Sequence, residues 1–135
     1  MTMRASGTFD VTILPLFAAI IGDDAPLARM SIEKQFHGDL EGTSKGEMLS
    51  SGSPATGSAG YVAIEKVTGT LQGREGTFAL QHSATMNRGV PSLSVTVIPD
   101  SGTGGLAGLS GSVDIIVENK KHSYTFDYSL GEAHG

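Results

Sequence analysis

The stretch Gly60–Met86 reads GYVAIEKVTGTLQGREGTFALQHSATM, and it decides the fold. Two long runs alternate apolar and polar side chains on either side of a short polar turn, which is the pattern of a β-hairpin. A turn at Gln72–Glu75 predicts that Glu65 faces His82 across the hairpin. An ionisable pair is therefore expected on an otherwise apolar face, whose other members are Tyr61, Val67, Phe78, Leu80 and Met86.

The composition bounds the class of protein. The chain has 135 residues, which suits a single domain, and a formal net charge of -5. Its basic residues are scattered, so no nucleic-acid partner is expected. The most apolar run, Ile13–Ile21, is about half of the ~20 residues that span a bilayer, so no membrane association is expected either. The absence of cysteine excludes disulfides and thiolate chemistry and fits a cytoplasmic location.

Outside the hairpin, short β-rich runs alternate with glycine, serine and threonine. This pattern predicts an all-β domain of eight antiparallel strands in an up-and-down barrel, calycin-like, over about residues 4–130. Closure pairs the last strand with the first and removes both sheet edges. The strands are expected near Ser6–Leu14, Leu27–Phe36, Leu40–Ser50, Gly60–Leu71, Gly76–Met86, Ser92–Ile98, Gly111–Val117 and His122–Leu130.

Two other segments need an interpretation. The apolar segment Pro15–Ile21 either forms a lid over a cavity or plugs one end of the core, and the sequence leaves both open. Gly102, Gly104 and Ala107 match the spacing of a dinucleotide-binding loop. The residues that follow are strand-like and provide no helix N-terminus for a phosphate, so we interpret these positions as turns and bulges.

Three predicted strands, Leu27–Phe36, Gly60–Leu71 and Gly76–Met86, each carry polar side chains on a face that is otherwise apolar, and these faces suggest a reactive site. If they all point inward, Lys34, Tyr61, Glu65 and His82 meet in one cavity. Glu65 would then act as a general base with His82 as its partner, and Tyr61 or Lys34 would donate to a developing oxyanion. The alternative is purely structural, because buried polar groups in a barrel often satisfy one another and only define the register.

The sequence supports two hypotheses for function. The first is a barrel that binds an apolar or aromatic small molecule; the second is a cofactor-independent lyase or isomerase that uses the Glu–His pair for elimination, isomerisation or cyclisation. No metal is expected, because the histidines lack ligand spacing. Outward-facing Val62, Ile64, Ile98 and Ile116 favour a homo-oligomer. The residues expected to contact a ligand are Phe78, Leu80, Met86, Val97, Tyr124, Phe126 and Tyr128.

Several stretches also carry a family resemblance. They are His37–Leu49, the hairpin Gly60–Met86, Ser101–Gly111 and His122–Tyr128. Together they resemble a bacterial family of unknown function whose fold is similar to the allene oxide cyclase barrel. The resemblance covers roughly residues 4–130 and implies an eight-stranded antiparallel barrel. It implies no activity, since the family has no established reaction and the functional residues of allene oxide cyclases cannot be matched here one by one.

Overall fold

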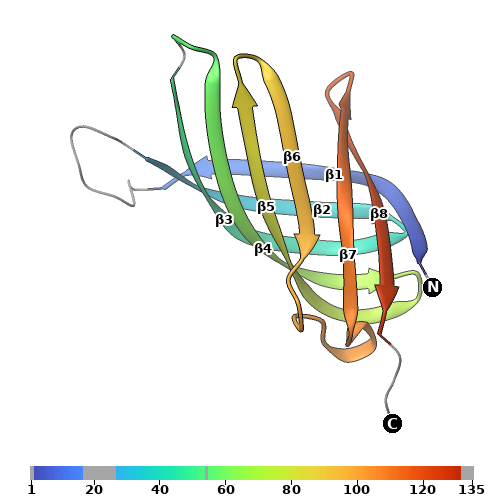
Figure 1. Ribbon diagram of the computed structural model, residues 1–135. Coiled ribbons are helices and arrows are strands. Elements are labelled where there is room, and N and C mark those ends of the chain that lie inside the picture. Colours follow the sequence, from blue (N-terminus) through green and yellow to red (C-terminus); the bar gives the residue numbers. More distant parts are fainter. Residues whose placement is uncertain (1, 17–26, 54, 132–135) are drawn as a thin grey trace.

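The computed structural model describes residues 2–16, 27–53 and 55–131. Eight strands alternate in direction along the chain, and one 3-10 turn, η1, separates the last two from the rest (Figure 1). The strands are β1 (Met3–Pro15), β2 (Ala28–Gly38), β3 (Leu40–Ser53), β4 (Ser58–Leu71), β5 (Arg74–Asn87), β6 (Val90–Val97), β7 (Leu109–Glu118) and β8 (Lys121–Leu130), with η1 at Gly104–Leu106.

The strands form a closed barrel in which each is hydrogen-bonded to its neighbours in the chain. The barrel closes between β1 and β8, where Met3 is opposite Tyr128 and Phe9 is opposite His122. The prediction of an all-β, eight-stranded antiparallel barrel is confirmed. Along most strands the side chains alternate between interior and solvent, as the pleat of a half-buried strand requires. Residues 17–26, which include most of the predicted lid or plug, lie outside the described part of the chain.

The register of the central hairpin differs from the prediction by two residues. The turn between β4 and β5 contains only Gln72 and Gly73, both with positive φ (46° and 87°), which matches the right-handed twist of the strands. Leu71 is therefore opposite Arg74. The turn between β5 and β6 is of the same kind, since it consists of Arg88 and Gly89 with φ of 48° and 86°.

The consequence is that the predicted direct partners are wrong but their common face is right. Glu65 is opposite Leu80, and His82 is opposite Ala63 on one side and Val95 on the other. Tyr61 is opposite Ala84. Since successive side chains point to opposite faces, a shift of two residues leaves every side chain on the face where it was expected.

The two ends of the barrel differ. We call the end that carries the β3–β4, β5–β6 and β7–β8 turns the upper end and the opposite one the lower end (Figure 1). The lower half is a packed core, and Leu106 of η1 is fully buried in it. The glycine-rich segment before β7 thus supplies an apolar plug, and Gly104–Leu106 form a single 3-10 turn. Other buried side chains of this core are Leu40, Leu71, Phe78, Leu109, Tyr124, Phe126 and Tyr128.

Candidate functional site

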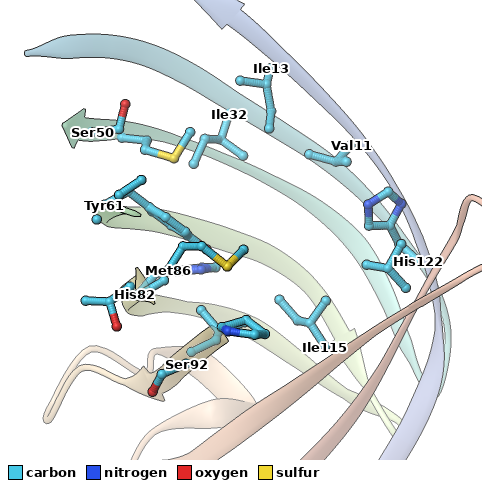
Figure 2. A pocket seen from close by; sticks show the side chains of 18 of the residues that line it. Val11, Ile13, Ile32, Ser50, Tyr61, His82, Met86, Ser92, Ile115 and His122 are labelled. Carbon is cyan, nitrogen blue, oxygen red and sulfur yellow. The ribbon is translucent and has the colours of Figure 1, made fainter. Parts of the chain in front are cut away.

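The upper half of the barrel is hollow. It contains a cavity of about 550 Å³ that is open to solvent and predominantly apolar. Residues from all eight strands line it, and Figure 2 shows many of their side chains around the cavity. The aliphatic part of the wall comes from Val11, Ile13, Ile32, Met48, Met86, Leu93, Ile115 and Val117. The polar residues along it are Lys34, Ser50, Tyr61, His82, Thr85, Ser92 and His122.

A buried carboxylate connects two of these polar residues. Oε2 of Glu65 lies 2.9 Å from Nζ of Lys34 and 3.1 Å from Nε2 of His82. Glu65 is fully buried, whereas Lys34 and His82 are 8% and 3% exposed and line the cavity. Glu65 itself is not among the lining residues, so it lies behind the cavity wall. The lysine and the histidine therefore separate the carboxylate from the cavity.

The local strand geometry explains how these residues meet. Lys34 on β2 is opposite Ser44 on β3, and Glu65 on β4 is opposite Gly46, so the two charged groups reach one another diagonally across β3. Diagonal neighbours on one face are within the reach of long side chains. Gly46 leaves no room for a larger residue, since a Cβ there would lie 2.1 Å from the carbonyl oxygen of Ile64. The close approach of β3 to β4 at Gly46 thus helps to bring the ion pair together.

The electrostatic state of Glu65 follows from its partners. Burial alone would raise the pKa of this carboxyl group, but the hydrogen bond from His82 and the charge of Lys34 together outweigh it, and the pKa is lowered. Glu65 is therefore ionised at neutral pH. Its second oxygen, Oε1, is buried without a hydrogen-bond partner, as is Oγ of Ser44. The buried carboxylate thus retains capacity to accept another hydrogen bond.

Lys34 is further held by aromatic rings. Its Nζ lies 4.9 Å from the ring centroid of Phe9 and 5.8 Å from that of Phe36. Both rings offer a favourable electrostatic surface to the ammonium group in addition to the carboxylate. Lys34 lies on an otherwise apolar face, and its ammonium group is paired there with the carboxylate of Glu65.

Tyr61 lies on the same side of the cavity. Its ring centroid is 6.4 Å from that of His82, and Figure 2 shows the two side chains close together in the cavity wall. Burial, and to a lesser extent the negative charge of Glu65, raise the pKa of the Tyr61 phenol. The hydroxyl therefore stays protonated at neutral pH and is able to donate a hydrogen bond. The structure thus brings together all four residues that the sequence singled out.

The seven residues predicted to contact a ligand lie in two different parts of the barrel interior. Of the seven, only Met86 lines the cavity. The other six belong to the packed core in the lower half of the barrel: Phe78, Leu80, Val97, Tyr124, Phe126 and Tyr128. These six side chains fill the lower half of the barrel and do not line the cavity, because the interior is only partly hollow. Contact of Met86 with a ligand stays a prediction.

Two of the core tyrosines instead use their hydroxyls to bind the lower turns. The Tyr124 hydroxyl accepts from the backbone N–H of Leu40 at 2.9 Å and donates to the carbonyl of His37 at 3.0 Å. The Tyr128 hydroxyl donates to the side-chain amide oxygen of Gln72. These bonds satisfy polar atoms at the lower end and give both residues a structural role.

Most of the cavity wall is not predicted by the sequence. One such residue is His122, whose side chain lines the cavity and whose ring lies 5.1 Å from that of Phe9. A signal was available, because His122 has the same parity on β8 as Tyr124 and Phe126, which are buried.

Within the described ranges, no three potential metal ligands come together. In the same part of the chain no helix has the length and apolar character needed to cross a bilayer.

Comparison with known proteins adds a family and a related structure. The profile of a family described as "Protein of unknown function (DUF3224)" matches residues 5–128. A crystal structure of a protein of unknown function from the same family, from Shewanella oneidensis MR-1, is 43% identical in sequence. It superposes with a TM-score of 0.90, and the match covers 97% of this chain and 99% of that one. No curated protein matches the chain.

Proposed function

This chain belongs to the DUF3224 family of proteins of unknown function, and on that premise we propose that it binds a small apolar or aromatic molecule in the upper half of the barrel. The observation that carries the proposal is the cavity of about 550 Å³ with its apolar wall. Ligand sites commonly measure about 300–1,000 Å³ and combine a mostly apolar lining with a few polar groups that orient the ligand. The aliphatic side chains would hold the body of the molecule.

The polar side of the cavity suggests one hydrogen-bonding group on the ligand. Lys34, Tyr61 and His82 all lie along it, and the charges of Lys34 and Glu65 balance one another. A neutral polar group would therefore suit this side better than a second carboxylate, whose charge would oppose that of the ionised Glu65. We expect the ligand to be uncharged, with its polar atom next to Tyr61 and His82.

A matched pair of tryptophan variants tests binding. Ala84 lines the cavity, while its neighbour Ser83 points outward and is exposed. With the neutral fluorescent probe N-phenylnaphthylamine, we expect the wild type and Ser83→Trp to bind and Ala84→Trp, whose indole fills the cavity, to lose binding at least about tenfold. Native mass spectrometry of the purified protein would also show any molecule that co-purifies. Equal binding by both variants, or none by the wild type, would contradict a ligand site here.

A second candidate function is general base catalysis, and the contact between His82 and Glu65 favours it. An ionised carboxylate only accepts hydrogen bonds, so Nε2 of His82 must carry the proton in that bond. In the neutral imidazole this leaves Nδ1 with its lone pair as the basic atom. Because Glu65 lies behind the cavity wall, His82 is better placed than Glu65 to reach a substrate. We therefore propose His82 as the base and Glu65 as its positioning residue, which reverses the roles assigned from sequence.

The reaction would be the removal of a proton from carbon next to a carbonyl group. His82 would accept that proton, and the phenol of Tyr61 or the ammonium of Lys34 would donate a hydrogen bond to the developing enolate oxygen. Returning the proton to a different carbon gives an isomerisation, and expelling a leaving group gives an elimination. Cyclisation, the third reaction expected from the Glu–His pair, stays a prediction from the sequence.

Exchange of carbon-bound protons tests this chemistry without knowledge of the substrate. β-Tetralone is apolar and aromatic and has acidic protons next to its carbonyl group, so its exchange in D₂O can be followed by NMR. We expect exchange with the wild type to exceed that with His82→Phe by about 10²–10⁴-fold, and Glu65→Gln to fall between them. Failure of the wild type to accelerate exchange, with bound β-tetralone confirmed by fluorescence displacement, would contradict a general base on this class of compound.

We also propose a cytoplasmic location and a homo-oligomer. The side chains of Val62 and Ile64 project outward from β4 and are 54% and 55% exposed. Contiguous exposed apolar side chains of this kind are typical of association surfaces. Light scattering after size exclusion would give the mass in solution, and replacement of both residues by serine should reduce it to that of one chain. Cell fractionation would test the location.

A further inference from the structure

The seam between β6 and β7 is the weakest in the barrel. These strands share a single register pair, Thr96 with Ser112. The seams on either side are continuous, since β5 and β6 pair from Leu80 to Asn87 and β7 and β8 pair along their whole length. Above the pair Thr96–Ser112 the two strands diverge toward the upper end, as Figure 1 shows.

The local sequence explains why the ladder stops. Pro91 in the upper part of β6 has no N–H to donate, and proline in a sheet is typical of an edge strand. On β7, Gly111 next to the single pair has a φ of 155°, and a Cβ there would lie 2.3 Å from the carbonyl oxygen of Asp127. Close packing of Gly111 against β8 draws the start of β7 toward that neighbour. The upper parts of β6 and β7 thus behave as two facing edges.

The gap between these edges opens onto the cavity. Pro91, Ser92 and Leu93 of β6 line the cavity from one side of the gap, and Ile115 and Val117 of β7 line it from the other. Leu93 is 42% exposed and Val117 is 59% exposed, although both point toward the interior. Apolar side chains that remain accessible beside a cavity are typical of a ligand route.

We propose that the ligand enters and leaves the cavity sideways between β6 and β7, and that Leu93 and Ile115 are the gate residues that limit its cross-section. Continuing the register of Thr96 and Ser112 upward would place Leu93 directly opposite Ile115. Both residues line the cavity, so their two side chains would flank the route above the paired segment. Large side chains at these positions would select slender or flat molecules over bulky ones. The inference rests on the proposed ligand-binding function and adds the route to it.

A reversible cross-link across the gap tests the route. The chain has no cysteine, so the variant Leu93→Cys/Ile115→Cys provides a single defined pair of thiols. Rates of association and dissociation of N-phenylnaphthylamine are measured by stopped-flow fluorescence before and after oxidation. Joining the strands should slow both rates by at least about tenfold, because the link obstructs the gap through which the ligand passes, and reduction should restore them.

The control ties β6 to its other neighbour. Ser83 and Ser94 are directly opposite on β5 and β6 and both side chains are exposed, so Ser83→Cys/Ser94→Cys forms a cross-link that leaves the gap free. Oxidation of this control should not change the rates. If the thiols of the test variant do not oxidise, a short bismaleimide reagent joins them and the same comparison is made.

The possible results distinguish failure of the sideways route from failure of the proposed ligand binding. Unchanged rates in the cross-linked test variant would overturn the sideways route while leaving ligand binding intact. Slowing of the test variant and the control to the same extent would also overturn it, because the effect would then come from rigidity of β6. Absence of probe binding in the wild type and in both reduced variants would instead remove the proposed function itself.

Discussion

Nε2 of His82 lies 3.1 Å from Oε2 of Glu65, although neither residue is the register partner of the other. Glu65 is opposite Leu80 and His82 is opposite Ala63, so the hydrogen bond runs diagonally between β4 and β5. The small side chain of Ala63 leaves space for the imidazole to lean toward the carboxylate. The same oxygen also receives Lys34, and the three residues form one buried charge cluster beside the cavity.

Replacement of Glu65 by glutamine should destabilise the fold strongly. The amide is nearly the same shape, but it leaves the buried ammonium of Lys34 without a counter-charge. Breaking a buried ion pair by removing one partner typically costs about 3–5 kcal/mol. Chemical denaturation followed by circular dichroism would give the change in free energy of unfolding.

The double variant Lys34→Met/Glu65→Gln is the control for that measurement. It removes both charges, so we expect it to be more stable than Glu65→Gln alone despite carrying one more substitution. If the double variant is the less stable of the two, uncompensated charge is not the reason for the loss.

Acid should remove part of the stability through Glu65. The ordinary pKa of this carboxyl group is 4.5 and the fold lowers it, so the unfolded chain takes up the proton first as the pH falls. The contribution of Glu65 to the free energy of unfolding is therefore complete above pH 4.5, and it disappears as the pH falls toward the lower pKa of the folded state. Denaturation of the wild type and of Glu65→Gln between neutral and acidic pH should show their difference shrinking in this range. A constant difference would contradict an ionised Glu65.

The phenol of Tyr61 should titrate above its ordinary pKa of 10.0, because burial and the charge of Glu65 both oppose the phenolate. In Glu65→Gln the charge is gone and only burial remains, so the pKa should move part of the way back. Ultraviolet absorbance of the phenolate, compared with that of Tyr61→Phe, isolates this residue from the other two tyrosines. A Tyr61 pKa that does not change in Glu65→Gln would show that the two residues are not coupled.

Leu106 should matter for stability and not for the cavity. It is fully buried at the lower end, and leucine-to-alanine changes in packed cores cost about 2–5 kcal/mol. Leu93→Ala, at a side chain that is 42% exposed, is the comparison and should cost much less. Both are measured by thermal unfolding. Binding of N-phenylnaphthylamine at a temperature where both variants are folded should be retained in Leu106→Ala, since Leu106 does not line the cavity.

The inward-facing glycines of β3 have a structural explanation. A Cβ at Gly42 would lie 2.3 Å from the carbonyl oxygen of Thr68, so β3 and β4 approach one another too closely for a side chain. Gly42 therefore leaves space neither for a large side chain opposite it nor for a ligand. Gly42→Ala should therefore lower the melting temperature, whereas alanine at Gly73, where a Cβ would meet nothing within 4 Å, should act only through the positive φ of that turn residue.

The sequence alone determined the class, the number of strands and the interior face of each, because the period of two in a strand records which side chains are buried. The alternation of apolar and polar residues along the sequence identified one inward-facing group, which consists of Lys34, Tyr61, Glu65 and His82. This held even though the hairpin register was off by two residues, since an even shift leaves the faces unchanged.

Which part of the interior is filled and which is open depends on the three-dimensional arrangement of the strands. Phe78 and Ile115 both point inward, yet one is fully buried in the core and the other lines the cavity. The difference depends on η1, which plugs the lower end, and on the point where β6 and β7 separate. The tertiary structure also places Glu65 behind the cavity wall. Height along the barrel axis and the spacing of non-adjacent strands govern these features, and the alternation along a single strand carries no information about either.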